Sequence, residues 1–259
     1  MPGTRPILGV LSATRRPQTT IVSDDEDSAY PATNLKVPRS DFVTRTLDNA
    51  GGESIVFDFK QPMSIGAVTV VNHNWAVDRT VWVQLSPVDS WGPPPVTETL
   101  PISLERTAYV FDSVYQYRFA CLRIIADEHT PAGYSSIGTI DWWVIWESDS
   151  CLEVAAKTVT ITDPSTLTRA RHGDATEREL VARSGMQIDF NNVRRAHALE
   201  LKRLLRDAVG SSGYVWFCED PADTSRSIYG PIMAMPEEAM VDPAGTRMHM
   251  RGLVIAEDV

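Results

Sequence analysis

The chain has 259 residues and a formal net charge of -10, with 43% hydrophobic and 22% charged residues. These proportions are typical of a globular protein that is long enough for two domains, each with its own core. The acidic balance argues against a nucleic-acid partner, because phosphate contacts require a basic surface.

The sequence also limits where the protein is made and how it is held together. No apolar run approaches the roughly 18 residues of a membrane span, and the first residues lack the continuous apolar core of a signal peptide. We therefore expect a protein made in a cytosol, without membrane insertion. Cys121, Cys151 and Cys218 match neither a disulfide framework nor a zinc motif, so we interpret them as small buried hydrophobes.

Residues 54–147 follow the pattern of short β-strands. Apolar side chains alternate with polar ones in two segments, which predicts half-buried strands with the following residues inward: Ile55, Phe57, Phe59, Val81, Val83 and Leu85. Residues 86–101 contain several prolines, which remove ladder donors, and are predicted to form a long exposed loop that carries Trp91. This region is predicted to be a β-sandwich or jelly roll.

The segment "TIDWWVIWE" predicts a strand with two apolar faces. Trp142 and Trp146 share one face, while Trp143 and Ile145 point the other way. A strand that is apolar on both faces is expected to be covered on its outer side by the second domain or by another subunit. Trp143 and Ile145 are therefore candidate subunit-interface residues.

After residue 148 the pattern changes to that of an α+β domain. An apolar stripe of Ala198, Leu201, Leu205 and Ala208, with Leu204 beside it, predicts one amphipathic helix that begins after Asn191 or Asn192. Strands are predicted on both sides of it, so we expect one helix to cover an antiparallel sheet.

Arg194 and Arg195 fall in the first turn of the predicted helix, where positive charge opposes the helix dipole. We expect acidic groups to face them. Arginine supplies 20 of the 24 basic residues, and it pairs well with carboxylates across interfaces. These two arginines are candidate contacts to a neighbouring subunit, whose acidic partner segment could be residues 23–27 or 217–223.

Residues 28–148 resemble the discoidin, or galactose-binding-like, jelly roll. The resemblance rests on "SAYPATNL", "SIVFDFKQPMSIGAVTVVNHNW", "YRFACLRIIAD" and "GYSSIGTIDWWVIWE". It implies a first domain over residues 1–148 whose loops at one end of the sandwich bind sugars, lipid head groups or protein partners. It also places "NHNW" at such a strand end.

Two interpretations of "NHNW" remain open. Aromatic rings stack on sugar faces and polar side chains donate hydrogen bonds to them, so one interpretation is a glycan site of these residues: Asn72, His73, Asn74, Trp75 and Trp91. In the other, Trp75 caps the core and the asparagines bond the backbone of the loop.

The sequence offers little for catalysis. The five histidines show no metal-ligand spacing, no glycine-rich phosphate loop occurs, and "GYSSIG" lacks the last glycine of a nucleophile elbow. We expect a protein that is not an enzyme, with no catalytic residues, no metal and no cofactor.

Residues 213–232, which follow the predicted helix, resemble structural proteins of bacteriophage tails. That resemblance implies a tail-tube-like domain over residues 149–259, joined to the jelly roll. We expect a virion protein of the tail tip or baseplate, such as a distal or minor tail protein, that forms a symmetric ring with copies of itself. Its other partners would be tail proteins and a host-surface glycan. A free, lectin-like carbohydrate-binding module is the alternative, and an unrecognised hydrolase is a third possibility.

Overall fold

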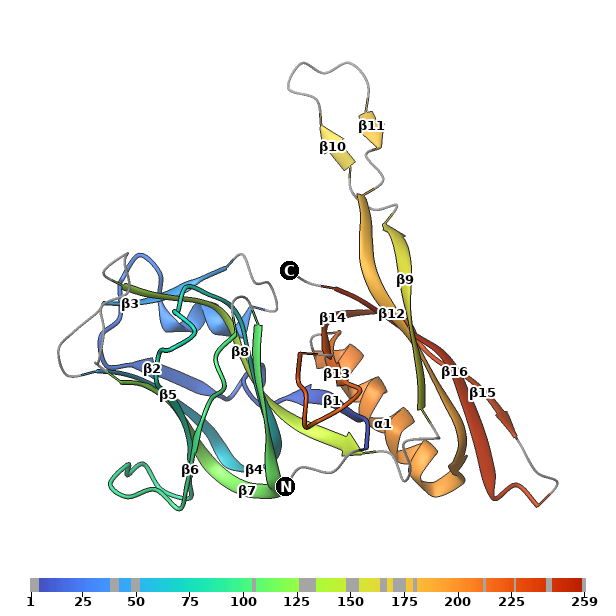
Figure 1. Ribbon diagram of the computed structural model, residues 1–259, viewed down its shortest axis with the longest axis horizontal. Helices are drawn as coiled ribbons and strands as arrows, with labels where there is room; N and C mark the ends of the chain where they lie inside the picture. The colour runs from blue at the N-terminus through green and yellow to red at the C-terminus, as the bar shows by residue number, and fades with distance from the viewer. Residues whose placement is uncertain are drawn as a thin grey trace.

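A computed structural model describes most of the chain (Figure 1). The described residues are 5–37, 42–47, 52–103, 106–125, 134–147, 154–163, 167–169, 176–178, 181–211, 213–225, 227–240 and 244–257. The predicted domain boundary at residue 148 and Cys151 lie outside them.

The first half of the chain forms a β-sandwich. Its elements are β2 (Thr20–Ser23), the short 3-10 helix η1 (Ala32–Lys36), β3 (Thr44–Leu47), β4 (Glu53–His73), β5 (Val81–Ser86), β6 (Val96–Thr99), β7 (Arg106–Ile124) and β8 (Tyr134–Glu147). The hydrogen-bonded order is β6-β5-β7-β4-β8, with β2 on β4 and β3 on β8. The first half of β4 pairs with β2, and its second half pairs with β8, so this long strand takes part in both layers.

The alternating apolar pattern identified the core of this sandwich correctly. All six residues predicted to point inward are fully buried, in a cluster that also contains Trp75 and Trp142. The proline-rich segment differs from its prediction, because Val96–Thr99 pairs with β5 as strand β6. The Pro-Pro-Pro run of that segment stops at Pro95, just before β6. The residues of β6 therefore keep the backbone N–H groups that a ladder requires.

The second half is a helix-covered antiparallel sheet, as predicted. Its elements are β9 (Val154–Asp163), β10 (Leu167–Arg169), β11 (Thr176–Arg178), β12 (Val181–Arg194), α1 (Arg195–Ser211), β13 (Tyr214–Cys218), β14 (Ser227–Ala234), β15 (Glu237–Met240) and β16 (Arg247–Ala256). Ala198, Leu201 and Leu205 of α1 are buried in its core. Figure 1 shows β9 and β12 extending away from the body, with β10 and β11 beyond them.

The helix begins later than its asparagines suggest. Asn191 and Asn192 belong to β12, which continues to Arg194, and α1 starts at Arg195. The ladder between β12 and β16 reaches Arg194, opposite Arg247, and the backbone N–H of Arg195 donates to the carbonyl of Thr246 over 2.9 Å. Pairing with β16 therefore outweighs the local preference of asparagine for a helix N-cap.

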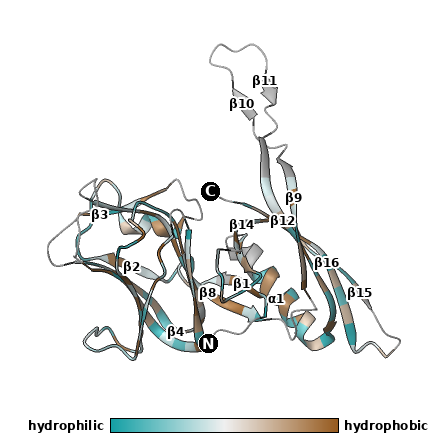
Figure 2. Ribbon diagram, viewed as in Figure 1, coloured by the Kyte–Doolittle hydropathy of each residue, from teal (hydrophilic) through white to brown (hydrophobic). Residues whose placement is uncertain are grey.

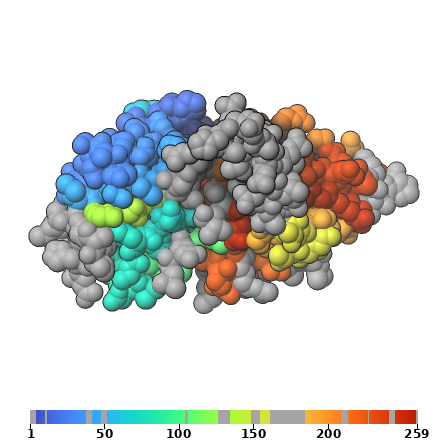
Figure 3. Space-filling model, turned by 90° about the horizontal axis from the view of Figure 1, so that it is seen from above, coloured from blue at the N-terminus to red at the C-terminus, as the bar shows by residue number. Residues whose placement is uncertain are grey.

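Strand β1 (Ile7–Ser12) joins the two halves into one sheet. It pairs with β8 of the sandwich on one edge and with β13 of the second half on the other. Within the described residues, the resulting sheet has 14 strands. Leu8 and Val10 are fully buried in the core of the second domain, although they precede the sandwich in sequence. Figure 3 shows the elongated body that results, with the N-terminal colours at one end and the C-terminal colours at the other.

A third apolar cluster lies at the junction between the halves, and we call it the junction core. It contains Ile7, Ala67, Val71, Ala108, Val110, Trp143, Trp216, Cys218 and Tyr229. Figure 2 shows hydrophobic segments on β8 and α1 on the two sides of the junction. Gly9 is required here, because a Cβ atom would lie 2.8 Å from the indole of Trp143.

A buried ion pair also crosses the junction. Arg15 donates two hydrogen bonds to the carboxylate of Asp141, of 2.9 Å and 2.7 Å, and these side chains are 2% and 0% exposed. Arg15 also donates to the hydroxyl of Tyr229 in β14, and Ser12 donates to Asp141. Burial alone would lower the pKa of Arg15, but the facing carboxylate outweighs it and raises the pKa. The pair therefore ties β8 to β14 in one arrangement.

Candidate functional site

The "NHNW" segment ends β4 with two buried rings. His73 is 7% exposed and Trp75 is 3% exposed, and their rings stack with centroids 4.6 Å apart. The backbone N–H of Trp75 contacts Nδ1 of His73 at 3.4 Å, so Nε2 carries the proton and faces the hydroxyl of Thr107 at 3.2 Å. Burial lowers the pKa of His73 to about 4, which keeps the ring neutral at pH 7.

The asparagines of this segment are placed differently from each other. Asn74 bonds the start of β8: its Oδ1 accepts from the N–H of Ser136 and its Nδ2 donates to the carbonyl of Tyr134, both over 2.9 Å. Asn72 is exposed and has a φ of 55°. The contacts of Asn74, His73 and Trp75 thus stabilise the end of β4. The buried face of Trp75 is not available for stacking on a sugar. The geometry favours the structural interpretation.

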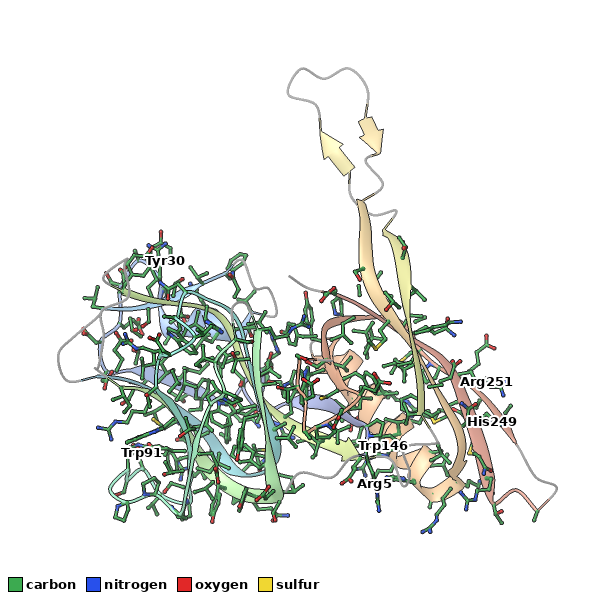
Figure 4. The ribbon with its side chains drawn as sticks, in the orientation of Figure 1. Arg5, Tyr30, Trp91, Trp146, His249 and Arg251 are labelled. Carbon is green, nitrogen blue, oxygen red and sulfur yellow. The ribbon has the colours of Figure 1, made fainter. Side chains whose placement is uncertain are left out.

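Trp91 does not join this segment. It is half-buried in the loop between β5 and β6, where its Nε1 donates to Asp89 over 3.2 Å. Figure 4 labels Trp91 and Tyr30 at opposite ends of the sandwich, and the contacts of Asn74 with Tyr134 place "NHNW" at the Tyr30 end. The predicted cluster of five residues therefore does not form.

Another set of side chains gathers at the Tyr30 end, and we call it the tyrosine clamp. The guanidinium carbon of Arg45 lies 3.7 Å from the ring centroid of Tyr30 and 4.5 Å from that of Tyr134. All three side chains are half-buried. The Nε of Arg45 is buried and has no hydrogen-bond partner within the described residues. Two partly exposed rings and a guanidinium can together stack on and donate to a polar ring-shaped ligand.

Sequence reasoning missed the tyrosine clamp for a clear reason. Tyr30 lies in "SAYPATNL", which pointed to the fold and not to a site, and Arg45 and Tyr134 carry no local signal. The clamp forms because β3 pairs with the start of β8, with Leu47 opposite Tyr134, and because the backbone N–H of Arg45 donates to the carbonyl of Tyr30.

The two interface candidates on β8 differ in exposure. Trp143 is 0% exposed, donates to the hydroxyl of Thr69 over 2.9 Å, and packs edge-on against Tyr229. The second domain of the same chain therefore covers Trp143, and the prediction of a contact with another subunit is wrong for this residue. Ile145 is half-buried and lines a cavity of about 100 Å³ together with Val110 and Pro221.

The two interface candidates at the helix start are exposed. Arg194 ends β12 directly opposite Arg247 of β16, and Arg195 follows as the first residue of α1. The first turn of α1 contains no acidic residue. Like charges on directly opposite strand residues repel, and positive charge at a helix N-terminus is unfavourable. The three arginines thus form a basic cluster on an acidic protein.

The remaining candidate features are the cysteines, possible metal ligands and possible membrane-spanning helices. Cys121 and Cys218 are free and buried, and burial raises the pKa of each thiol to about 12, so both are protonated at neutral pH. In the described part of the chain, no group of three or more His, Cys, Asp or Glu side chains is placed to hold a metal ion. None of the described helices is long and apolar enough to cross a membrane.

Comparisons with solved structures find jelly-roll modules. The family 32 carbohydrate-binding module of Clostridium perfringens NanJ, in complex with galactose, is 12% identical, covers 53% of this chain and 99% of its own, and has a TM-score of 0.43. The lectin domain of lectinolysin, complexed with Lewis B antigen, is 12% identical, with 52% and 97% covered and a TM-score of 0.43. A fucose-binding module of Streptococcus pneumoniae is 16% identical, with 51% and 94% covered and a TM-score of 0.40.

This likeness concerns only the fold of about half of the chain, the share that each of these structures covers. No protein-family model matches the chain, and no curated protein matches it.

Proposed function

We propose that this chain is a non-enzymatic structural protein of a phage virion, located in the tail tip or baseplate, that assembles as a ring with copies of itself. The sequence resemblance of residues 213–232 to phage tail proteins supports it, as does the pairing of a jelly roll with a helix-covered sheet. The neighbouring tail proteins are its further partners.

The extended strands β9 and β12 carry this proposal. Residues 161–163 of β9 pair with residues 181–183 of β12, beyond the point where β12 meets the end of β16: Gly185 is paired with Ala256, and the carbonyl of Ser184 accepts a hydrogen bond from the N–H of Glu257. Within the described residues, this part of the sheet is a two-stranded ribbon. An isolated two-stranded ribbon is marginally stable in water, so contact with another molecule would stabilise it.

The basic cluster provides the test. Replacing both Arg194 and Arg195 with glutamate is expected to weaken self-assembly at least tenfold, because it removes the arginines that would meet carboxylates of the next copy. The monomer should remain folded, since both side chains are exposed and the helix dipole favours the new charges. Sedimentation velocity of both proteins at matched salt measures the assembly, and circular dichroism checks the fold.

A matched control for this variant is the replacement of Arg203 and Arg206 with glutamate. These arginines are also exposed on α1, but lie away from its first turn. We expect the control to assemble like the wild type. If the wild-type chain stays monomeric at high concentration, also in the presence of its tail neighbours, the ring proposal is contradicted.

Glycan binding by the jelly roll is the second candidate function, and the tyrosine clamp favours it. Among the similar structures, the family 32 module is in complex with galactose and the lectin domain with Lewis B antigen. In a ring at a tail tip, such binding would serve attachment to a host-surface glycan.

We expect Arg45→Ala to abolish glycan binding, because it removes the guanidinium between the two rings. Arg118→Ala is the matched control, since Arg118 also lies over an aromatic ring, that of Phe119, but outside the clamp. A glycan array followed by calorimetry with galactose- and fucose-containing glycans measures the effect. If the wild type binds none of them, or if both variants bind equally well, glycan binding at the clamp is excluded.

A further inference from the structure

A cavity of about 100 Å³ lies at the junction between the two halves of the chain, and we call it the junction cavity. Its wall comes from β1, β7, β8 and the loop after β13, with these residues: Ile7, residues 110–114, Ile145, Glu147 and Pro221. Both halves of the chain therefore build it. An apolar cavity of about 150 Å³ holds a benzene molecule, so the junction cavity has room for a short aliphatic chain.

A bulge in β7 shapes the cavity. Where the ladder between β4 and β7 is interrupted, β4 contributes one residue, Gly66, and β7 contributes four, residues 111–114. Bulges turn side chains out of the ladder and are frequent next to active sites. A Cβ atom at Gly66 would clash with the side chain of Ile145. The glycine therefore allows Ile145 to take its place in the cavity wall.

The floor of the junction cavity is apolar and its rim is acidic. Ile7, Val110 and Pro221 are buried, whereas the carboxylates of Asp112 and Glu147 belong to exposed side chains. The two carboxylates therefore lie where the cavity meets the solvent. A ligand would bury an apolar part against the floor and keep a charged part at the rim.

The acidic character continues beyond the rim. The loop after β13 passes the cavity at Pro221 and carries three acidic residues between positions 219 and 223. It is held against β7, because the hydroxyl of Thr224 donates to the carbonyl of Ala108 over 3.3 Å. Among the described residues, no lysine or arginine lines the cavity. The rim therefore attracts a positive group and repels a negative one.

We propose that the junction cavity binds a short aliphatic chain that carries a positive charge, with the chain against the apolar floor and the cation facing Asp112 and Glu147. Two kinds of molecule present this chemistry: a free alkylammonium ion, and a protein segment in which an aliphatic side chain is flanked by lysine or arginine. Because both halves of the chain build the wall, the bound ligand would stabilise the junction. This inference does not rest on the ring proposal.

Small probes test the charge and the chain separately. n-Butylammonium has both, n-butanol lacks the charge, methylammonium lacks the chain, and butyrate reverses the charge. At matched ionic strength, we expect n-butylammonium to shift the methyl NMR signals of Ile7, Val110 and Ile145 and to bind about fivefold more tightly than n-butanol. Methylammonium and butyrate at the same concentration should leave these signals unchanged.

Blocked tripeptides distinguish the two sources of the ligand. Lys-Leu-Lys presents a leucine between two positive charges, Lys-Ala-Lys removes most of the aliphatic side chain, and Glu-Leu-Glu reverses the charges. If a protein segment is the ligand, Lys-Leu-Lys should bind about tenfold more tightly than n-butylammonium and than the other two peptides, because it also meets the acidic loop. If n-butylammonium binds at least as tightly as Lys-Leu-Lys, a free amine is the ligand.

A double variant tests the two carboxylates. Asp112→Asn combined with Glu147→Gln removes both charges and keeps the size of the side chains. We expect it to weaken n-butylammonium binding about tenfold and to leave n-butanol binding unchanged, which also shows that the cavity is intact. Both side chains are exposed, so the fold should be retained. Glu200→Gln combined with Asp207→Asn is the matched control, because it removes two exposed carboxylates of α1, and it should bind like the wild type.

The outcomes are distinct. Selective binding of n-butylammonium that is weakened in the double variant and retained in the control would support the proposal. Equal binding of n-butylammonium and n-butanol, or equal loss in the double variant and its control, would overturn it, because the rim carboxylates would then not select the ligand. Unchanged methyl signals with every probe and peptide would also overturn it. Self-assembly enters none of these measurements, so they leave the ring proposal to its own test.

Discussion

Deletion of residues 1–12 is expected to leave the second domain unfolded. The deletion removes β1, which separates β8 from β13 and contributes Leu8 and Val10 to the core around α1. Two fully buried aliphatic side chains and the whole ladder on β13 are lost together, which exceeds the margin of about 5–15 kcal/mol that keeps a domain folded. Near-UV circular dichroism and NMR dispersion of the second domain measure the loss.

Deletion of residues 1–5 is the matched control, because it ends before β1. The free energy of unfolding of this shortened chain should equal that of the full chain. The single change Leu8→Ala provides a graded check and should lower the free energy of unfolding by about 2–5 kcal/mol, because it opens a cavity in the second-domain core. Native stability of the second domain after loss of residues 1–12 would contradict the role assigned to β1.

Trp75→Ala is expected to lower the free energy of unfolding by about 3–5 kcal/mol, the cost of removing a large buried aromatic side chain. Trp75 packs in the sandwich core and stacks on His73. Chemical denaturation followed by fluorescence measures the change. Trp91→Ala is the matched control in the half-buried loop between β5 and β6, and should change stability far less.

The same variant decides between the two interpretations of "NHNW". Its glycan binding, measured at a temperature where the variant is folded, should match that of the wild type. If Trp75→Ala instead retained its thermal stability and lost glycan binding, Trp75 would be part of a ligand site, and the structural interpretation would be wrong.

The sequence predicted those elements whose signal is local. The period-two alternation around Phe57 and Val83 identified strands that are buried on one face, and the stripe of Leu201 and Leu205 identified α1 and its buried face. In both cases the spacing of apolar residues along the chain determines which side of the element meets the core. The class of the fold, mainly β with one described α-helix, followed from these patterns.

The features that the sequence could not predict depend on pairing between distant segments. The pattern of "ILGVLS" does not indicate that it separates β8 from β13, and the three residues of the tyrosine clamp come from three separate segments. The start of α1 was also misplaced, because the ladder to Arg247 extends β12 past Asn192. The burial of Trp143 by Tyr229 likewise depends on how the two halves meet.

The position of β1 has a consequence for synthesis on the ribosome. β1 is translated before both of its partner strands, because β8 is complete only at Glu147 and β13 only at Cys218. Between these points the nascent chain holds a finished sandwich with one open strand edge on β1, which invites pairing with another nascent chain. A pause in translation between residues 147 and 218 would prolong that exposure, so synonymous codons in this interval are expected to affect the yield of folded protein more than those after residue 218.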